Sequence, residues 1–503
     1  MNSMTQQSNT IKLKTFDGKP IEFIDVVKAS GGMKDCYFSP DRTYAVLFFR
    51  DRQDAQSKER LLEIVTRYKT NIFDRDGGEY WKNLFCWPEG VVEWNGRLGI
   101  VTPFYQRHFF FEHGSKNKDS LDIKGKDKEG KWFSAHHRKK SLDERELGDW
   151  RNLLKICVLI SRSVKRLHAA GLAHSDLSYK NVLVDPVSGS ACIIDIDGLV
   201  VPGKFPPDVI GTPDFIAPEV VATQALSRSD SNKKLPSIAT DRHALAVLIY
   251  FYLLCRHPLD GDKIHDINDE LRDQSLRMGE RALFVEHPTD HSNNIKVKNR
   301  KPSELPWWDT SKIPYTITGP YLVPLFNAAF IDGLSDPNKR PTADDWESAL
   351  VKTIDLIQPC QNSACEQKWY VFDNSSKPKC PFCGTAHRGK LPVLNLYSTR
   401  RAGNFMPDNH RLMVYSSQSL FMWHVSRLIT PNERLEDKHK KRVGYFVEQN
   451  GLWYLVNENM KDLRDVANKI DYPPGSKVEL VEGLQLLLSR EDGGRLIQVQ
   501  MTN

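Results

Sequence analysis

The chain has 503 residues, of which 40% are hydrophobic and 27% charged, and it carries a formal net charge of +6. This composition is typical of a globular protein with several domains and excludes a chain that is disordered throughout. The charge is too mild to indicate nucleic acid as a partner.

The first part of the chain predicts a small mixed domain. Residues 10–110 alternate short strand-like runs with turns. A pattern of helical spacing interrupts these runs at residues 57–72, where apolar side chains fall on one side. Residues 111–141 are rich in lysine and poor in apolar residues. For this segment we expect a solvated insertion without regular structure.

The rest of the chain predicts three further parts. Residues 142–358 carry mostly helical patterns, beginning with an amphipathic helix that ends at Gly171. A cysteine-bearing module occupies residues 359–390, and residues 391–503 return to strand-like runs between Gly and Pro turns. The predicted fold class is therefore multidomain α+β, with a C-terminal all-β sandwich.

Polar side chains gather at the rims of one predicted hairpin. The runs "NVLVD" and "ACIIDID" flank the turn "PVSGS", a pattern that favours two buried strands. Asp176, Lys180 and Asn181 lie at the start of the first run, and Asp195 and Asp197 end the second. Carboxylate and amide oxygens are the ligands that Mg²⁺ prefers, so this rim is a candidate functional site.

The motifs around this hairpin occur in the order found in protein kinases, and the segment resembles that family. "HSDLSYKN" matches the catalytic loop H-R-D-x-x-x-x-N through His174, Asp176 and Asn181, with serine in place of arginine. "IIDIDG" stands where D-F-G is expected, and "GTPDFIAPE" contains A-P-E. The resemblance implies a bilobal kinase fold, with an N-lobe in residues 10–110 and a C-lobe in residues 142–358. It also implies two structural contacts, made by Asp241 with the catalytic loop and by Arg340 with Glu219.

The resemblance implies a role for each polar residue of the hairpin. Phosphoryl transfer from ATP depends mainly on positioning and on neutralising charge. Asp176 accepts or orients the proton of the acceptor hydroxyl, and Lys180 offsets charge on the transferred phosphate. Asn181 and Asp195 hold Mg²⁺ or Mn²⁺. Asp197 is either a second ligand or a turn former, and the motif leaves open which carboxylate binds the metal.

The N-terminal part departs from the kinase pattern. "YAVLFFR" resembles V-A-I-K, but Leu47 stands where the phosphate-binding lysine is expected. The best replacement is Lys34 in "SGGMKDCYF", in which Gly31 and Gly32 are candidates for the turn over the phosphates, and Arg50 is the second choice. The motif is not G-x-G-x-x-G, so an ordinary turn with a surface lysine stays open. The expected helix partner of the lysine is Glu59 or Glu63, with a weak preference for Glu63.

Four cysteines predict a structural zinc site. Cys360 and Cys365 form one close pair, Cys380 and Cys383 a second, and fourteen residues separate the pairs. This spacing favours a tetrahedral Cys₄ site, and residues 359–390 are too short to fold without the metal. Redox chemistry and nucleic-acid contact are the alternatives. No run of 18 apolar residues occurs and the N-terminus lacks the apolar core of a signal peptide, so we expect a cytoplasmic protein with reduced thiols and no membrane contact.

The C-terminal part, residues 391–503, is similar to forkhead-associated domains around "LWYLVNEN" and "LVEGLQLLLS". Such domains bind phosphothreonine peptides through Arg, Ser and Asn side chains. Ser426, Arg427 and Asn468 are the candidates here. The Gly-Arg and Ser-x-x-His signatures are absent, so a sandwich without phosphopeptide binding stays open.

The combination of parts resembles bacterial kinases associated with tellurium-resistance-type operons. This resemblance implies an ATP- and Mg²⁺-dependent protein serine/threonine kinase in a stress or defence signalling system. It implies protein substrates and, as partners, a von Willebrand A-domain protein and a metal-dependent phosphatase. One alternative is a pseudokinase scaffold that binds nucleotide weakly, which the missing strand lysine favours. Another is a nucleic-acid-binding adaptor that uses the cysteine module and the lysine-rich segment.

Overall fold

The computed structural model describes residues 9–30, 32–74, 77–201, 203–205, 211–227, 229–401 and 403–502. The chain divides into two compact units. The first comprises residues 1–148, 156–309 and 326–345, and the second comprises residues 149–155, 310–325 and 346–503. In the described part of the chain, no helix combines the length and the apolar character needed to cross a membrane.

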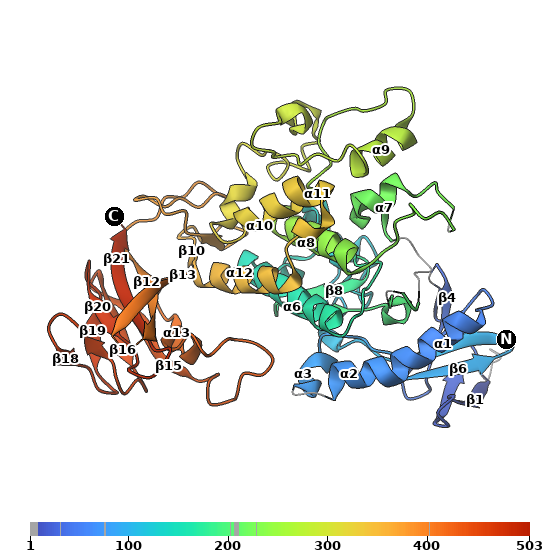
Figure 1. The fold of residues 1–503 in the computed structure, drawn as a ribbon, viewed down its shortest axis with the longest axis horizontal. Coiled ribbons are helices and arrows are strands. Elements are labelled where there is room, and N and C mark those ends of the chain that lie inside the picture. Colours follow the sequence, from blue (N-terminus) through green and yellow to red (C-terminus); the bar gives the residue numbers. More distant parts are fainter. Residues whose placement is uncertain are drawn as a thin grey trace. The chain divides into compact units, whose positions relative to one another are not determined.

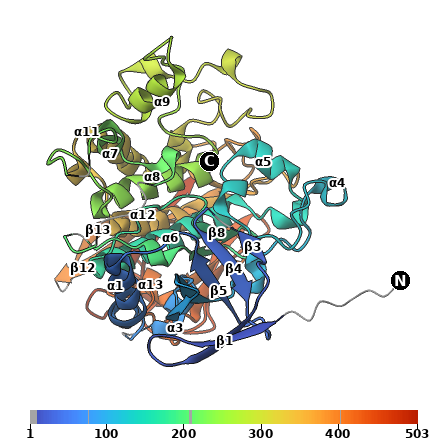
Figure 2. The ribbon, with the colours of Figure 1, turned by 90° about the vertical axis from the view of Figure 1, so that its right-hand side faces the viewer.

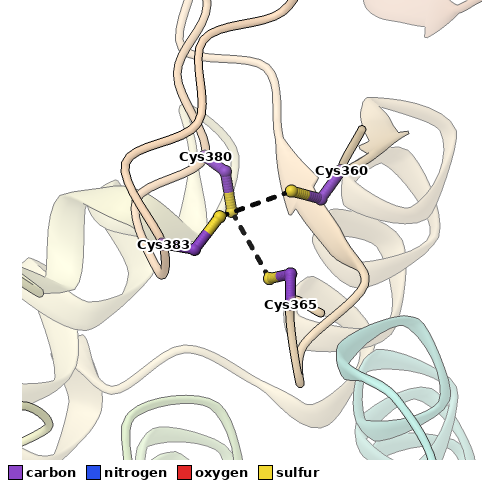
Figure 3. A group of neighbouring side chains, drawn as sticks. All are labelled: Cys360, Cys365, Cys380 and Cys383. Carbon is purple, nitrogen blue, oxygen red and sulfur yellow. Dashed lines mark hydrogen bonds between the residues drawn. The ribbon is translucent and has the colours of Figure 1, made fainter. Parts of the chain in front are cut away.

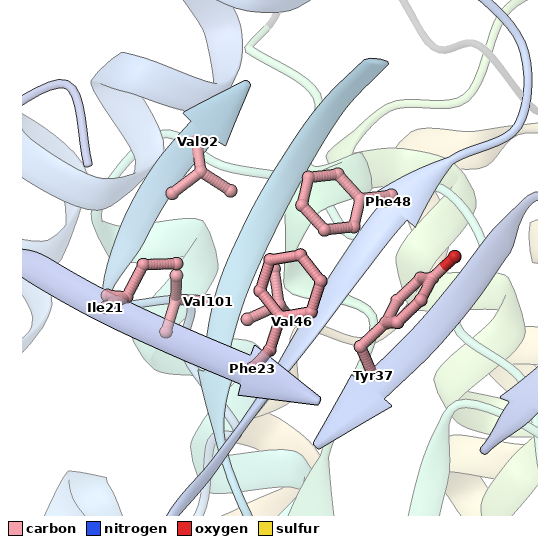
Figure 4. Packing of buried hydrophobic residues seen from close by; sticks show 7 residues of the cluster. All are labelled: Ile21, Phe23, Tyr37, Val46, Phe48, Val92 and Val101. Atoms are coloured by element: carbon pink, nitrogen blue, oxygen red, sulfur yellow. The ribbon is translucent and has the colours of Figure 1, made fainter. Parts of the chain in front are cut away.

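The first unit begins with antiparallel strands, drawn in blue in Figures 1 and 2. A hairpin of β1 and β2 precedes a five-stranded sheet in the order β3-β4-β5-β7-β6. In β5, Val46 and Phe48 lie on the sheet face that packs against Phe23 of the hairpin (Figure 4). Leu47 and Phe49 belong to the opposite face, as the two-residue period of a strand requires. The strands are β1 (Thr10–Lys14), β2 (Pro20–Ile24), β3 (Ala29–Ser30), β4 (Lys34–Phe38), β5 (Tyr44–Phe49), β6 (Gly90–Trp94) and β7 (Arg97–Pro103).

The helix expected at residues 57–72 is present and begins two residues earlier. It comprises α1 (Ala55–Glu63), a π-helical turn (Ile64–Tyr68) and α2 (Lys69–Phe73), followed by α3 (Gly78–Lys82) (Figure 1). The Asp54 carboxylate accepts a hydrogen bond from the Ser57 backbone N–H at 2.7 Å and caps the first turn. The Ile64 carbonyl oxygen accepts the Lys69 backbone N–H of the π-helical turn and also a bond of 2.9 Å from the Trp87 indole.

The prediction of a solvated, irregular segment at residues 111–141 is wrong. The segment contains α4 (Lys116–Asp119), a 3₁₀ turn (Gly130–Trp132) and α5 (His136–Ser141), and it buries Ile123 and Phe133. Lys128 is buried as well, and its ammonium lies 2.8 Å from Glu146 and 2.9 Å from Asp185. The high lysine content of the segment favoured a solvated loop. However, Glu146 and Asp185, which lie outside the segment, neutralise Lys128 and allow it to be buried.

Lys128→Met is expected to lower the free energy of unfolding by about 3–5 kcal/mol, because it leaves two buried carboxylates without their cation. The measurement is urea unfolding of the full chain. Lys126→Met is the matched control: its ammonium is exposed and lies 3.6 Å from the exposed Asp122, so we expect a loss below about 1 kcal/mol. Equal losses in the two variants would contradict a structural role for the buried ions.

Helices make up most of the remaining first unit. The long α8 has apolar residues on all sides and is buried almost throughout, as expected for a central helix. Arg340, whose side chain is fully buried, forms two bonds of 2.8 and 2.7 Å with the Glu219 carboxylate, so the ion pair expected from the sequence is present. The helices from here to the cysteine module are α6 (Trp150–Ala169), α7 (Pro218–Ala222), α8 (Ile238–Leu254), α9 (Glu270–Met278), α10 (Val323–Asn327), α11 (Gly333–Ser335) and α12 (Ala343–Asp355).

The second unit contains the cysteine module and the C-terminal strands. A six-stranded sheet has the order β13-β12-β21-β20-β17-β18, and a four-stranded sheet has the order β14-β15-β16-β19; all their pairings are antiparallel. Asp355 at the end of α12 lies 2.7 Å from His410 and 3.3 Å from His424. The elements are β10 (Ile357–Pro359), β11 (Trp369–Val371), β12 (Leu391–Arg401), β13 (Asn404–Met413), β14 (Ser419–Phe421), α13 (Met422–Val425), β15 (Arg442–Gln449), β16 (Leu452–Asn457), β17 (Arg464–Asp465), β18 (Ile470–Asp471), β19 (Lys477–Glu479), β20 (Gln485–Leu487) and β21 (Arg495–Thr502).

Candidate functional site

The loop before strand β8 (Val182–Asp185) is held in an unusual backbone conformation. Ser175 has a positive φ of 66°, which costs free energy for a residue with a side chain. The Asp241 carboxylate accepts bonds from the backbone N–H groups of His174 at 2.7 Å and Ser175 at 3.2 Å. The His174 ring nitrogen Nε2 lies 2.9 Å from the carbonyl oxygen of Ile194, just after β9 (Ser190–Ile193). The loop is thus braced from α8 and from the hairpin, and the contact expected of Asp241 is present.

Asp176 and Asn181 face each other across this loop. The Asn181 amide nitrogen donates to the Asp176 carboxylate at 2.9 Å and to its backbone carbonyl at 2.8 Å. The other Asp176 oxygen accepts from the backbone N–H of Thr212 at 2.7 Å and from its hydroxyl at 2.8 Å. These bonds hold the carboxylate in one orientation. They also use the amide nitrogen of Asn181, which leaves its amide oxygen available as a ligand.

Lys34, Asp195 and Asp197 form a cluster of one ammonium and two carboxylates. The Lys34 ammonium nitrogen lies 2.8 Å from Asp195 and 2.6 Å from Asp197. The Lys34 and Asp197 side chains are 15% and 6% exposed, whereas that of Asp195 is 45% exposed. Lys34 is the first residue of β4, and its backbone pairs with Phe49 of β5, which fixes where its side chain starts.

The same contacts shift the pKa values of these three groups. Burial lowers the pKa of Lys34, but the two carboxylates outweigh this effect, and the net pKa is raised. Burial raises the pKa of Asp197. Burial also opposes ionisation of Asp195, but the Lys34 charge prevails and lowers the pKa of that carboxyl. The cluster is therefore charged at neutral pH at least on Lys34 and Asp195.

A cavity of about 510 Å³ connects these groups, a size typical of small-molecule sites. Its lining includes Leu47 on the sheet side and Thr212 on the side of the segment before A-P-E. The lining also contains nearly all the residues that the sequence singled out for nucleotide and metal, namely Gly32, Lys34, Asp176, Lys180, Asn181, Asp195 and Asp197. Gly31 lies outside the described residues. A side chain at Gly32 would meet open space, and its φ is not positive, so the fold itself does not require glycine there.

The expected helix partners of the lysine are paired elsewhere. Glu63 and Glu59 lie 2.6 and 3.3 Å from the ammonium of Lys204, in the segment after the hairpin. Among the ion pairs of the described residues, none joins Lys34 to either glutamate, so that expectation is wrong. The physical reason is proximity: Asp195 and Asp197 neutralise Lys34 directly. Arg50, the second choice for a phosphate ligand, pairs with Asp35 at 2.9 Å.

The sequence reasoning missed other residues of the site. Thr212 directly contacts Asp176. It lies six residues before Pro218 of A-P-E, and this spacing from a recognisable motif could have identified it from the sequence. Arg60 of α1 is buried and lines the cavity, on the helix face where a glutamate was expected. No sequence pattern distinguishes Arg60 from Lys58, the other cation of α1.

The four cysteines form a second candidate site, in the second unit. Figure 3 shows their sulfur atoms directed toward one another from two loops. All four lie within 4.8 Å of each other, with Cys360 to Cys383 at 3.5 Å and Cys365 to Cys380 at 3.8 Å. Tetrahedral Zn–S bonds of about 2.3 Å place sulfur atoms about 3.8 Å apart. The cysteines therefore fit one zinc ion.

The phosphopeptide candidates of the C-terminal part have other contacts. The Arg427 backbone N–H donates to the Gly493 carbonyl at 3.0 Å, and the Asn468 amide donates to Asp465 at 2.8 Å. Among the hydrogen bonds of the described residues, none joins Asn468 to Ser426 or Arg427. The structure therefore does not bring these three side chains together through direct bonds.

Comparison with known proteins bears on the first candidate site. The family model "Protein kinase domain" matches residues 126–348, which include the braced loop, the hairpin and the Arg340–Glu219 ion pair. The chain contains a protein-kinase-like domain. The residues that this kinase-like domain contributes to the cavity include Asp176, Asn181 and Asp195, whereas the strands of residues 10–103 precede the matched range.

Individual relatives match shorter parts of the chain. Death-associated protein kinase dapk-1 of Caenorhabditis elegans is 35% identical over 103 residues, 20% of this chain and 6% of the relative. Human serine/threonine-protein kinase H1 is 30% identical over 118 residues, 22% of this chain and 26% of the relative. Human serine/threonine-protein kinase D2 is 26% identical over 152 residues, 28% of this chain and 15% of the relative. The chain thus spans about a quarter or less of the length of each of these relatives.

Proposed function

We propose that the chain is an ATP- and Mg²⁺-dependent protein serine/threonine kinase. The observation that carries this proposal is the convergence of Asp176, Asn181, Asp195 and Lys34 on one cavity of nucleotide size. The match to the protein kinase domain and the similarity to proteins named serine/threonine-protein kinases support it.

Each residue has a role that its surroundings support. Asp176 orients the acceptor hydroxyl and accepts its proton, and the bonds from Thr212 and Asn181 hold it in place. Lys180 lines the same cavity and offsets charge on the transferred phosphate. Lys34 takes the place of the strand lysine, because Leu47 at that strand position is apolar and cannot bind a phosphate.

The donor set fits a divalent cation. Asn181 offers an amide oxygen, and Asp195 and Asp197 offer carboxylate oxygens, which are the ligands of Mg²⁺ and Mn²⁺. The bound cation would neutralise phosphate charge during transfer. Asp195 is our first choice as ligand, because its exposed carboxylate opens into the cavity, and Asp197 is the second.

The remaining parts of the protein have proposed roles of their own. We propose an N-lobe at residues 10–110 and a C-lobe at residues 142–358 of one bilobal kinase fold, with the zinc module at residues 359–390. The two C-terminal sheets support a forkhead-associated-like sandwich at residues 391–503, for which we propose phosphopeptides as ligands. A stress or defence role with a von Willebrand A-domain protein and a phosphatase follows only from the resemblance to kinases of tellurium-resistance-type operons.

A second candidate function is a pseudokinase scaffold that binds nucleotide weakly. One observation favours it: both carboxylates proposed for metal already pair with Lys34, the proposed phosphate ligand. The presence of Asp176 and Asn181 in a braced loop argues against it, because a scaffold needs neither group.

Incubation of the purified chain with γ-labelled ATP and Mg²⁺ or Mn²⁺ separates the two functions. We expect label on the chain itself or on a generic acceptor such as myelin basic protein, and its absence in an Asp195→Asn variant. Nucleotide binding without any transfer by the parent chain would favour the scaffold.

A further inference from the structure

The contact between Lys34 and the two aspartates places a cation where the proposed metal must bind. Its ammonium bridges one oxygen of Asp195 and one oxygen of Asp197 at hydrogen-bond distance. Carboxylate oxygens are also what Mg²⁺ and Mn²⁺ require, at about 2.1 Å for Mg²⁺. Lys34 therefore lies within the proposed metal site, and it does not occupy a separate position beside the phosphates.

Lys34 and a divalent cation compete for these carboxylates. Both are positive, so they repel each other at short range, and the low solvent exposure of Lys34 and Asp197 leaves little water to screen the repulsion. A cation that uses Asp195 and Asp197 therefore has to displace the ammonium. The displacement is favoured because the divalent cation carries a charge of +2 and attracts the two carboxylates more strongly than the ammonium, which carries +1.

The backbone allows Lys34 to move without unfolding the sheet. Its register with Phe49 in the β4–β5 ladder keeps the Cα in place, while the four-carbon side chain has freely rotating bonds. The ammonium also lies 5.3 Å from the centre of the Phe49 ring, which a displaced ammonium can still approach. The released charge stays at the cavity wall, because the two preceding residues, Gly32 and Met33, line the same cavity.

We infer that Lys34 is an exchangeable cation of this site. It neutralises Asp195 and Asp197 until a divalent cation takes their oxygens, and it is then released toward the phosphates of the nucleotide. The inference rests on the proposed function, because it takes the cavity as a site for metal and nucleotide. It adds a coupling between the two ligands: metal binding makes the phosphate-binding lysine available.

The exchange predicts effects of opposite sign on the two ligands. Lys34→Met removes the competitor of the metal, so Mn²⁺ should bind about tenfold more tightly without nucleotide, equivalent to ~1.4 kcal/mol. The same variant removes a phosphate ligand, so binding of ATP in the presence of Mg²⁺ should weaken. A lysine with only a structural role would weaken both ligands together.

The first readout is the affinity of the full chain for Mn²⁺ without nucleotide. Electron paramagnetic resonance measures the free Mn²⁺ at each step of the titration. The Asp195→Asn/Asp197→Asn double variant gives the background from other sites. Lys28→Met is the matched control, because Lys28 is an exposed lysine just before β3 and outside the cavity lining; we expect parental Mn²⁺ affinity. Lys34→Gln, whose amide can still donate hydrogen bonds to the carboxylates, serves as the second variant where Lys34→Met folds poorly.

Unchanged or weaker Mn²⁺ binding in both Lys34 variants would overturn the inference, and so would Mn²⁺ binding no better than that of the double variant. The outcome is distinct from that of the proposed function. A chain that transfers phosphate while its Lys34 variants leave Mn²⁺ affinity unchanged refutes the exchange alone. A chain that shows the Mn²⁺ effect but transfers no phosphate refutes the kinase assignment and keeps the exchange.

Discussion

Asp176→Asn is expected to lower the rate of phosphate transfer by about 10³-fold, because an amide cannot accept the proton of the acceptor hydroxyl. The substitution preserves size and part of the hydrogen bonding. The amide oxygen can still accept from Thr212, but its nitrogen then faces the Asn181 amide nitrogen, which is itself a donor. One hydrogen bond is lost, and the fold is kept.

Phosphate transfer is measured in an activity assay, and ATP binding is measured by calorimetry. We expect the affinity for ATP to change by less than about threefold, because Asp176 is not a proposed metal ligand. Asp230→Asn is the matched control, because Asp230 lies outside the cavity lining and accepts a local bond from the Asn232 backbone. Transfer at the parental rate by Asp176→Asn would remove this residue from the mechanism.

Cys380→Ser is expected to abolish zinc binding, from about one equivalent in the parent to below about 0.2, because a tetrahedral structural site rarely survives the loss of a thiolate. Cys380 is fully buried in the module, and its backbone also bonds to Thr385 and Gly384. Because metal binding and folding are coupled in so small a module, its backbone should unfold locally.

Zinc content by mass spectrometry gives the first readout, and hydrogen exchange of residues 360–384 gives the second. Cys157→Ala is the control: this cysteine is buried in α6, far along the chain from the quartet, and its loss should leave zinc bound. A parent chain without zinc, or a Cys380→Ser chain that retains it, would refute the assignment.

Local motifs allowed part of this architecture to be anticipated. "HSDLSYKN" places Asp176 and Asn181 on one loop, since five residues of chain leave little choice, and the structure brings them within 2.9 Å. The Arg340–Glu219 pair was also expected, because A-P-E and the arginine are recognisable over 121 residues of separation. In both cases the residue types themselves predict the contact, because one partner is a hydrogen-bond donor and the other is a carboxylate.

Contacts that depend on long-range geometry could not be anticipated in the same way. Glu63 was a reasonable partner for Lys34 by position on its helix, yet the structure pairs it with Lys204. Lys128 looked like one more solvated lysine until Glu146 and Asp185 were seen around it. A charged residue gives no sign in the sequence of whether its counter-ion lies on the same element or a hundred residues away.

The two bonds between Asp176 and Thr212 also close a loop, because 36 positions of chain separate these residues. Joining the ends of a flexible loop of that length costs about 3 kcal/mol of chain entropy. The carboxylate proposed for catalysis therefore also restrains Thr212, which lines the same cavity. The position of Thr212 and the orientation of the proposed catalytic carboxylate therefore depend on the same Asp176 oxygen atom.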